Sequence, residues 1–177
     1  LRKSRGVIKN PDQIIESAMR PYQPPQRFLT LFSGLPVESF FDEVPEEDCP
    51  SPVAECAWIN ADSGRIERIL KGRGSRRGYY FVEIKLNERV ERRLQISAEG
   101  TLLSQVDRIR ESELPKTVKP AMNEFIAAGA RFDGADHVLT TEREEFHIEL
   151  DLGDDRDLHL FLDDRGVLLR QHEVGDF

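Results

Sequence analysis

Residues 49–174 predict an α+β fold made of two tandem units, each a helix followed by an antiparallel sheet. Three observations predict this fold. A stretch of alternating apolar residues occurs twice, a helical pattern that opens at a proline precedes each stretch, and a turn containing glycine follows each one. We expect the helices to pack on one face of the sheets, and the two sheets can be continuous.

The repeat is seen when residues 80–86 are aligned with residues 146–152, an offset of 66. No gap is needed through residues 105 and 171, and one inserted residue upstream brings Pro50 onto Pro115. The tandem units therefore run over 49–106 and 114–174. Seven of the 26 aligned positions are identical: Glu83 and Glu149, Leu86 and Leu152, Leu94 and Leu160, Gly100 and Gly166, Leu102 and Leu168, Leu103 and Leu169, Gln105 and Gln171.

Helical and strand periodicities define the elements of each unit. In the second unit the apolar residues of a helix ended by Gly129 share one face, and the first unit has a shorter version of that face. Residues 80, 82, 84 and 86 alternate with polar positions as in a strand, and a partner strand carries Leu94 and Ile96 inward. The expected helix residues are Val118, Met122, Phe125 and Ile126 in the second unit, and Val53, Ala57 and Trp58 in the first.

Residues 1–48 form an N-terminal extension of less regular pattern. Asn10 and Pro11 are typical of a helix start, and we expect a short helix to about Met19, a strand over 27–32, a helical turn over 37–41 and a loop over 42–52. The chain begins with Leu1, which indicates that a signal peptide or a longer N-terminus preceded it.

Composition and charge argue against several classes of protein. A net charge of −8 opposes nucleic-acid binding, because phosphate recognition needs a dense basic surface. No stretch reaches the roughly 20 apolar residues of a membrane span. Cys49 and Cys56 are interpreted as two reduced, partly buried thiols, because their spacing suits neither zinc nor a disulfide across a helix. We expect no cofactor.

The pattern resembles the PepSY-like, β-lactamase-inhibitor-protein-like (BLIP-like) family. The resemblance is carried by Leu114-Pro115 before a helix, Ala130-Arg131-Phe132, a strand over 145–150 and a closing stretch over 160–169. It implies a periplasmic or secreted bacterial protein whose tandem units align their sheets into one broad surface, with which some members are proposed to restrain peptidases or other enzymes. Cys49-Pro50 and the basic loop at 72–78 depart from the family pattern, and they leave any inherited partner open.

The sheet face that points away from the helices is the candidate partner-binding site. Aromatic side chains among charged ones on an open sheet are typical of recognition surfaces, while a solvated face with incidental rings is the alternative. We expect Phe81, His147, His159 and Phe161 to be exposed together there. The full set of candidate residues is Tyr79, Phe81, Glu83, Arg93, His147, Glu149, His159 and Phe161.

Other candidate chemistries are weaker. His147, Glu149 and His159 suit a metal or acid–base cluster by residue type, but the predicted turn does not place His159 opposite His147. The aspartates over 151–164 lack the register of a calcium loop, and the glycines over 72–78 lack the lysine and helix of a phosphate loop. No nucleophile lies in a recognisable catalytic context.

We therefore expect a non-catalytic module that binds a protein or peptide, such as an inhibitor or a sensor domain. The alternative is a structural or assembly protein whose open face is covered by residues 1–48 or by a second copy in a homodimer.

Overall fold

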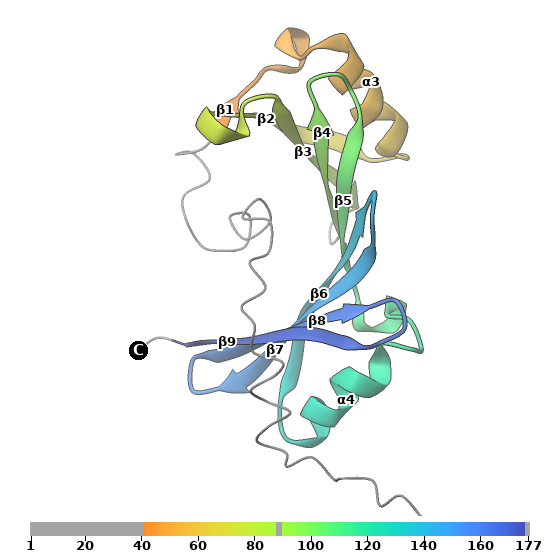
Figure 1. Cartoon of the computed structure of the whole chain (residues 1–177), viewed down its shortest axis with the longest axis vertical. Coiled ribbons are helices and arrows are strands. Elements are labelled where there is room, and N and C mark those ends of the chain that lie inside the picture. The colour runs from red at the N-terminus through yellow and green to blue at the C-terminus, as the bar shows by residue number, and fades with distance from the viewer. Residues whose placement is uncertain (1–40, 88–89, 176–177) are drawn as a thin grey trace, which may run out of the picture. The chain divides into compact units, whose positions relative to one another are not determined.

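The computed structural model describes residues 41–87 and 90–175, and this part of the chain forms one antiparallel β-sheet of nine strands (Figure 1). Each strand pairs with the next one along the chain. The strands are β1 (Phe41–Glu43), β2 (Arg65–Gly72), β3 (Tyr79–Asn87), β4 (Val90–Ser97), β5 (Leu102–Ile109), β6 (Arg131–Thr140), β7 (Glu144–Gly153), β8 (Arg156–Asp163) and β9 (Leu168–Gly175). The helices of this part are α3 (Ser51–Asn60) and α4 (Lys119–Ala127), with short 3-10 turns η2 (Glu46–Asp48), η3 (Gly74–Arg76) and η4 (Glu111–Glu113).

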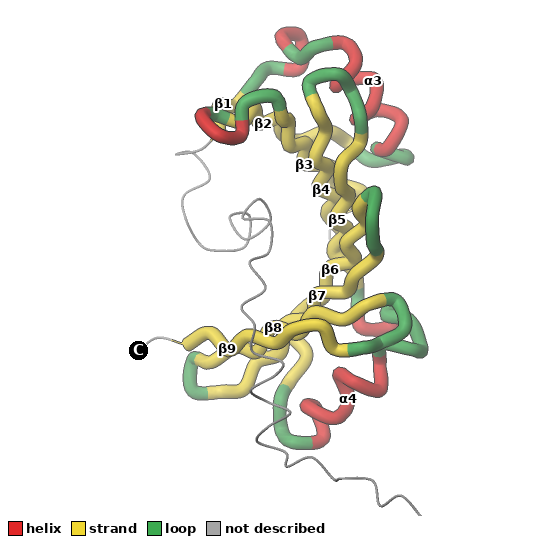
Figure 2. The backbone as a smooth tube through the Cα atoms, viewed as in Figure 1, coloured by secondary structure: helices red, strands yellow, loops and turns green. Residues whose placement is uncertain are grey.

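The fold is mainly β, and the predicted α+β fold of two helix-plus-sheet units is wrong. Helices α3 and α4 have only 10 and 9 residues, and Figure 2 shows that strands make up most of the described backbone. The sheets of the two expected units are continuous, as the sequence allowed, because β5 and β6 pair without interruption from Ser104 opposite Thr140 to Ile109 opposite Ala135. All described residues belong to one compact unit. The boundaries at 106 and 114, and the duplication itself, stay predictions.

Both helices cover the same face of this sheet. Directly opposed residues of an antiparallel pair share a face, as do residues two apart on one strand. Val82 is opposite Leu94, Leu94 is opposite Gln105, and Gln105 is opposite Leu139. Four residues before Leu139, Ala135 is opposite Ile148, which lies in the core under α4. We call this side the helix face and the other side the open face; Figure 1 shows α3 and α4 on the same side.

Helix α3 begins after Pro50, and Pro52 lies in its first turn, where a missing N–H costs nothing. Val53 and Ala57, four residues apart, are fully buried against Val82, Leu94 and other apolar residues of β2–β4. Trp58 is half exposed, so its predicted place on the packed side of the helix is wrong.

Helix α4 packs as predicted. Val118 and Met122 have no exposed surface, and Phe125 and Ile126 pack at the border of the same core. The core beneath them consists of the inward residues of β7 and β8, including Ile148, Leu150, Leu158, Leu160 and Leu162. Burying an aliphatic side chain of this size stabilises the fold by roughly 1.5–3 kcal/mol, which explains how so short a helix is held on the sheet.

The turn between β8 and β9 fixes the start of α4. Gly166 has a φ of +81°, and a Cβ on this residue would lie 2.0 Å from the carbonyl oxygen of Thr117. The Thr117 hydroxyl donates a hydrogen bond to the Asp164 carbonyl over 2.8 Å. The predicted tight turn at this glycine is confirmed, and it also brings the sheet into contact with the helix.

The predicted helix over 10–19 and the predicted strand over 27–32 lie outside the described residues. Phe41, expected to end a helical turn, begins strand β1 instead. The loop expected over 42–52 contains the rest of β1, the turn η2 and the start of α3, because Asp42 and Glu43 pair with β2. No helix in the described ranges is both long enough and apolar enough to cross a membrane.

Candidate functional site

The open face holds all eight residues predicted as the partner-binding site. The register connects them across the sheet: Phe81 is opposite Gln95, Glu83 is opposite Arg93, His147 is opposite Phe161, and Glu149 is opposite His159. The same face continues from β4 to β7, because Arg93 is opposite Val106, Val106 is opposite Val138, and Val138 is opposite Glu145. The eight residues lie in two groups, one on β3 and β4 and the other on β7 and β8.

The group on β3 and β4 is less exposed than expected. Phe81 is buried, and its ring meets the ring of Phe41 edge to face with centroids 4.8 Å apart. The guanidinium of Arg76 lies over the Phe41 ring at 5.2 Å. The predicted exposure of Phe81 is therefore wrong, although no helix of the described part covers it. Glu83 accepts two hydrogen bonds of 3.0 Å from Arg68 on β2.

The group on β7 and β8 forms an aromatic centre together with β9. The edge of the His147 ring meets the Phe161 ring with centroids 4.4 Å apart. The guanidinium of Arg170 on β9 lies over Phe161, 3.7 Å from its centroid, and Phe161 and Arg170 are directly opposed in the register. Such a cation–π contact is worth about 0.5–2 kcal/mol. Three side chains from three strands are thus held in one arrangement, and Phe161 is partly exposed.

The buried Glu145 holds the His147 ring of this centre in place. Nε2 of His147 is 3.2 Å from a Glu145 carboxylate oxygen, and Nε of Arg143 is 2.9 Å from the other oxygen. The hydrogen bond with His147 holds the pKa of Glu145 below its ordinary value, against the opposite effect of burial. The carboxylate therefore stays charged and restrains the imidazole beside Phe161.

An ionic cluster crosses the middle of the open face from β4 to β7. Asp136 is almost completely buried, with Nη2 of Arg93 at 3.5 Å and Nη1 of Arg108 at 3.6 Å. Arg108 also donates a hydrogen bond of 2.9 Å to Glu149. Burial raises the pKa of Asp136, while the charges of the two arginines oppose that rise. The cluster joins β4, β5, β6 and β7 through side chains as well as through the sheet.

Gly134 makes room for this cluster. It lies on β6 opposite Glu149, next to a register shift, and Arg108 crosses it to reach that carboxylate. A Cβ on Gly134 would be 1.7 Å from Nη2 of Arg108. Any residue other than glycine must displace the guanidinium.

Histidines on β8 and β9 extend the open face to the end of the sheet. His159 is opposite Glu149 on one side and His172 on the other. His147 is opposite Phe161, so His159 and His147 are not directly opposed, as the sequence predicted. Within the described ranges, no three His, Cys, Asp or Glu side chains are placed to hold a metal ion.

The acidic and basic loops have structural roles. Asp151 accepts a hydrogen bond of 2.6 Å from the Gly153 amide, and Asp163 accepts hydrogen bonds from the amides of Arg165 and Val167, so these carboxylates cap turns. The basic loop at 72–78 contains the turn η3, and Arg73 pairs with Asp42 on β1.

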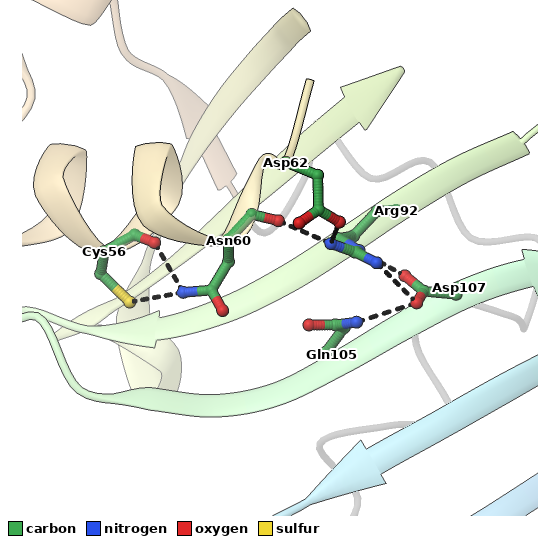
Figure 3. A network of polar contacts seen from close by, with 6 residues as sticks. All are labelled: Cys56, Asn60, Asp62, Arg92, Gln105 and Asp107. Carbon is green, nitrogen blue, oxygen red and sulfur yellow. Dashed lines mark hydrogen bonds and ion pairs between the residues drawn. The ribbon is translucent and has the colours of Figure 1, made fainter. Parts of the chain in front are cut away.

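A second polar network lies on the helix face and is structural (Figure 3). Arg92 donates two hydrogen bonds to Asp107, at 2.7 and 3.0 Å, and one of 2.7 Å to each of the Asn60 carbonyl and Asp62. It therefore ties the end of α3 to β4 and β5. Asn60 in turn donates to the carbonyl of Cys56 at 2.7 Å. Cys49 and Cys56 are free and half-buried, and burial raises the pKa of both thiols.

Sequence reasoning missed Arg170, Arg108 and Asp136. Arg170 directly follows the apolar pair Leu168-Leu169, where alternation indicates a strand but not its partner. Arg108 and Asp136 meet only because β5 pairs with β6. No local signal in the sequence specifies that pairing.

Comparison with known proteins identifies the fold. No protein-family model matches the sequence, and no curated protein matches it either. Solved structures do. A DUF2874 family protein from Bacteroides ovatus has a TM-score of 0.56 and 18% identity, with 72% of this chain and 89% of that chain covered. A BLIP-like protein from Bacteroides fragilis has a TM-score of 0.55 and 17% identity, with 76% and 90% covered.

A third similar structure comes from Bacteroides eggerthii, and that protein is provisionally described as periplasmic. Its TM-score is 0.56 at 13% identity, with 71% of this chain and 88% of that chain covered. At such identities the likeness concerns the fold alone, which is BLIP-like. The PepSY-like part of the predicted resemblance is not supported by these structures.

Proposed function

We propose that this chain is a non-catalytic protein-binding module that contacts its partner through the open face. The observation that carries the proposal is the aromatic centre, in which His147 and Arg170 hold the partly exposed Phe161 between them. Aromatic residues and arginine are enriched among the residues that dominate the binding energy of protein interfaces. Aromatic rings bury much surface and lose little conformational freedom.

The side chains of the open face are held in place by one another, which supports a binding surface rather than a solvated face with incidental rings. The ionic cluster of Arg93, Asp136, Arg108 and Glu149 fixes four neighbouring strands, so the aromatic centre lies on a preorganised surface. Preorganisation raises affinity because fewer side chains must be ordered on binding. An inhibitor of an enzyme is one form of such a module, and the similarity to a BLIP-like protein agrees with it.

We also propose an extracytoplasmic location. Its support is the similar protein from Bacteroides eggerthii that is provisionally described as periplasmic.

The test is a pull-down from extracts of the source organism with the full chain, compared with two variants. Phe161→Ala removes the centre of the open face, and Trp58→Ala removes a half-exposed ring from α3 on the opposite side of the sheet. We expect the first variant to lose a specific partner by at least tenfold, since a hot-spot residue contributes about 2 kcal/mol or more. The second variant should retain it. Equal retention by both variants would exclude the open face.

The alternative is self-association through the same face, as in a structural or assembly protein. Light scattering after size exclusion distinguishes the two functions. A dimer that Phe161→Ala converts to a monomer supports assembly, whereas a monomer at all concentrations leaves the face for another protein.

A further inference from the structure

Strand β9 forms one end of the sheet. It pairs with β8 from Leu168 to Gly175, with a register shift at Leu169, and no other strand of the described ranges pairs with it (Figure 1). An edge strand of this length presents a row of backbone N–H and C=O groups on its outer side. Such an edge is a template for another strand unless the protein protects it.

This edge has only part of the usual protection, because the register shift lies at Leu169 and residues 170–175 pair regularly beyond it. Residues 168–175 include neither proline nor lysine, the residues that most often block edge pairing. Four of the six exposed large apolar residues of the described part lie on β9 or in the turn before it. Leu169 is 51% exposed and Val174 is 44% exposed. Clustered apolar exposure of this kind indicates a contact surface.

The charges along β9 specify what kind of strand fits. Arg170 and His172 lie on the open face, opposite Phe161 and His159, and Val174 follows on the same side. In an antiparallel partner, an apolar residue would face Val174, and the second and fourth residues after it would face His172 and Arg170. Carboxylates at those two positions complement the basic pair.

A second copy of β9 fits poorly. In a symmetric dimer, a two-fold axis perpendicular to the sheet would relate the two copies of β9. Opposed residues then share a face only when the axis passes through a residue of the strand and not between two residues. An axis at Arg170 opposes arginine with arginine, and an axis at Glu173 opposes two carboxylates. Directly opposed like charges destabilise a strand pair.

We propose that β9 binds an extended acidic segment of a partner protein as a tenth strand, with glutamate or aspartate side chains at alternate positions facing Arg170 and His172. Main-chain hydrogen bonds supply affinity, and the alternate side chains supply specificity. Arg170 belongs to the aromatic centre as well, but the edge pairing is argued from the backbone of β9 and does not rest on the function proposed for that centre.

The probe is a fluorescently labelled peptide, Val-Thr-Glu-Thr-Glu-Thr-Val, blocked at both ends and titrated against the full chain by fluorescence anisotropy. We expect saturable binding. The same peptide with lysine in place of glutamate should bind at least tenfold more weakly. Two further peptides carry N-methyl groups on one or the other set of alternate residues; one of the two should lose binding, because only one set directs its N–H groups at β9.

A charge reversal on the protein tests the same preference with the same two peptides. His172→Glu, at an exposed position, should reverse the preference toward the lysine peptide, whereas Lys71→Glu on β2 should leave the preference unchanged. Absence of saturable binding, equal binding of the glutamate and lysine peptides, or equal binding of both N-methylated peptides would overturn the proposal. So would a dimer that His172→Glu strengthens, which would show that β9 pairs with itself.

Discussion

Replacing Gly166 by alanine tests how the sheet holds α4. The residue has a φ of +81°, which costs an alanine about 1–2 kcal/mol. Its Cβ would also lie 2.0 Å from the Thr117 carbonyl oxygen, a contact that backbone alone forms and that no rotamer relieves. The turn must move away, and the hydrogen bond from Thr117 to Asp164, worth about 1 kcal/mol, is lost together with part of the packing around Val118. We expect a total loss of about 3 kcal/mol in the free energy of unfolding.

Gly153→Ala is the matched control. Gly153 has a φ of +79°, almost the same as Gly166, but a Cβ there would meet no atom within 4 Å. This variant should lose only the conformational part, about 1 kcal/mol. Urea denaturation of both variants, followed by circular dichroism, gives the two values. Equal losses would refute the contact between the β8–β9 turn and the start of α4.

Two further predictions concern ion pairs. Arg92→Ala leaves the carboxylate of Asp107 without its main partner, in a site where both side chains are less than one sixth exposed. We expect urea denaturation to show a loss of about 3 kcal/mol in the free energy of unfolding. Arg65→Ala, at an exposed ion pair, should change that free energy by less than about 0.5 kcal/mol. The hydrogen bond with His147 holds the folded-state pKa of Glu145 below its ordinary value of 4.5. The stabilising effect of this carboxylate is therefore present above pH 4.5 and is lost as the pH falls through the folded pKa. Glu145→Gln should lose this pH dependence, and parallel stability curves for the two proteins below pH 4.5 would contradict the restraint by His147.

The face that each strand residue occupies could be predicted from the sequence. Alternation of apolar and polar residues is local, because it depends only on the two-residue period of a strand. Val82, Ile84, Leu94 and Ile96 are accordingly buried on the helix face. The eight candidate residues share the open face for the same reason, since they occupy the alternate positions.

The pairing of distant strands could not be predicted in this way. Ser104 to Ile109 pair with β6 across the segment that contains α4, and this pairing makes the sheets of the two expected units continuous, which the sequence allowed but did not specify. The hydrogen bond between Arg108 and Glu149 joins residues 41 positions apart. Phe81 is buried because Phe41, from a strand outside the expected units, packs against it. Side-chain periodicity carries no information on such contacts.

Hydroxyl-radical footprinting of the full chain with its bound partner tests the central claim most directly. Aromatic rings react according to their exposure, and the chain carries one tryptophan, Trp58, on the helix side. We predict that binding lowers the oxidation of Phe161 and Tyr79 and leaves that of Trp58 unchanged. Protection of Trp58 with unchanged oxidation of Phe161 and Tyr79 would place the partner on the helices and contradict the account.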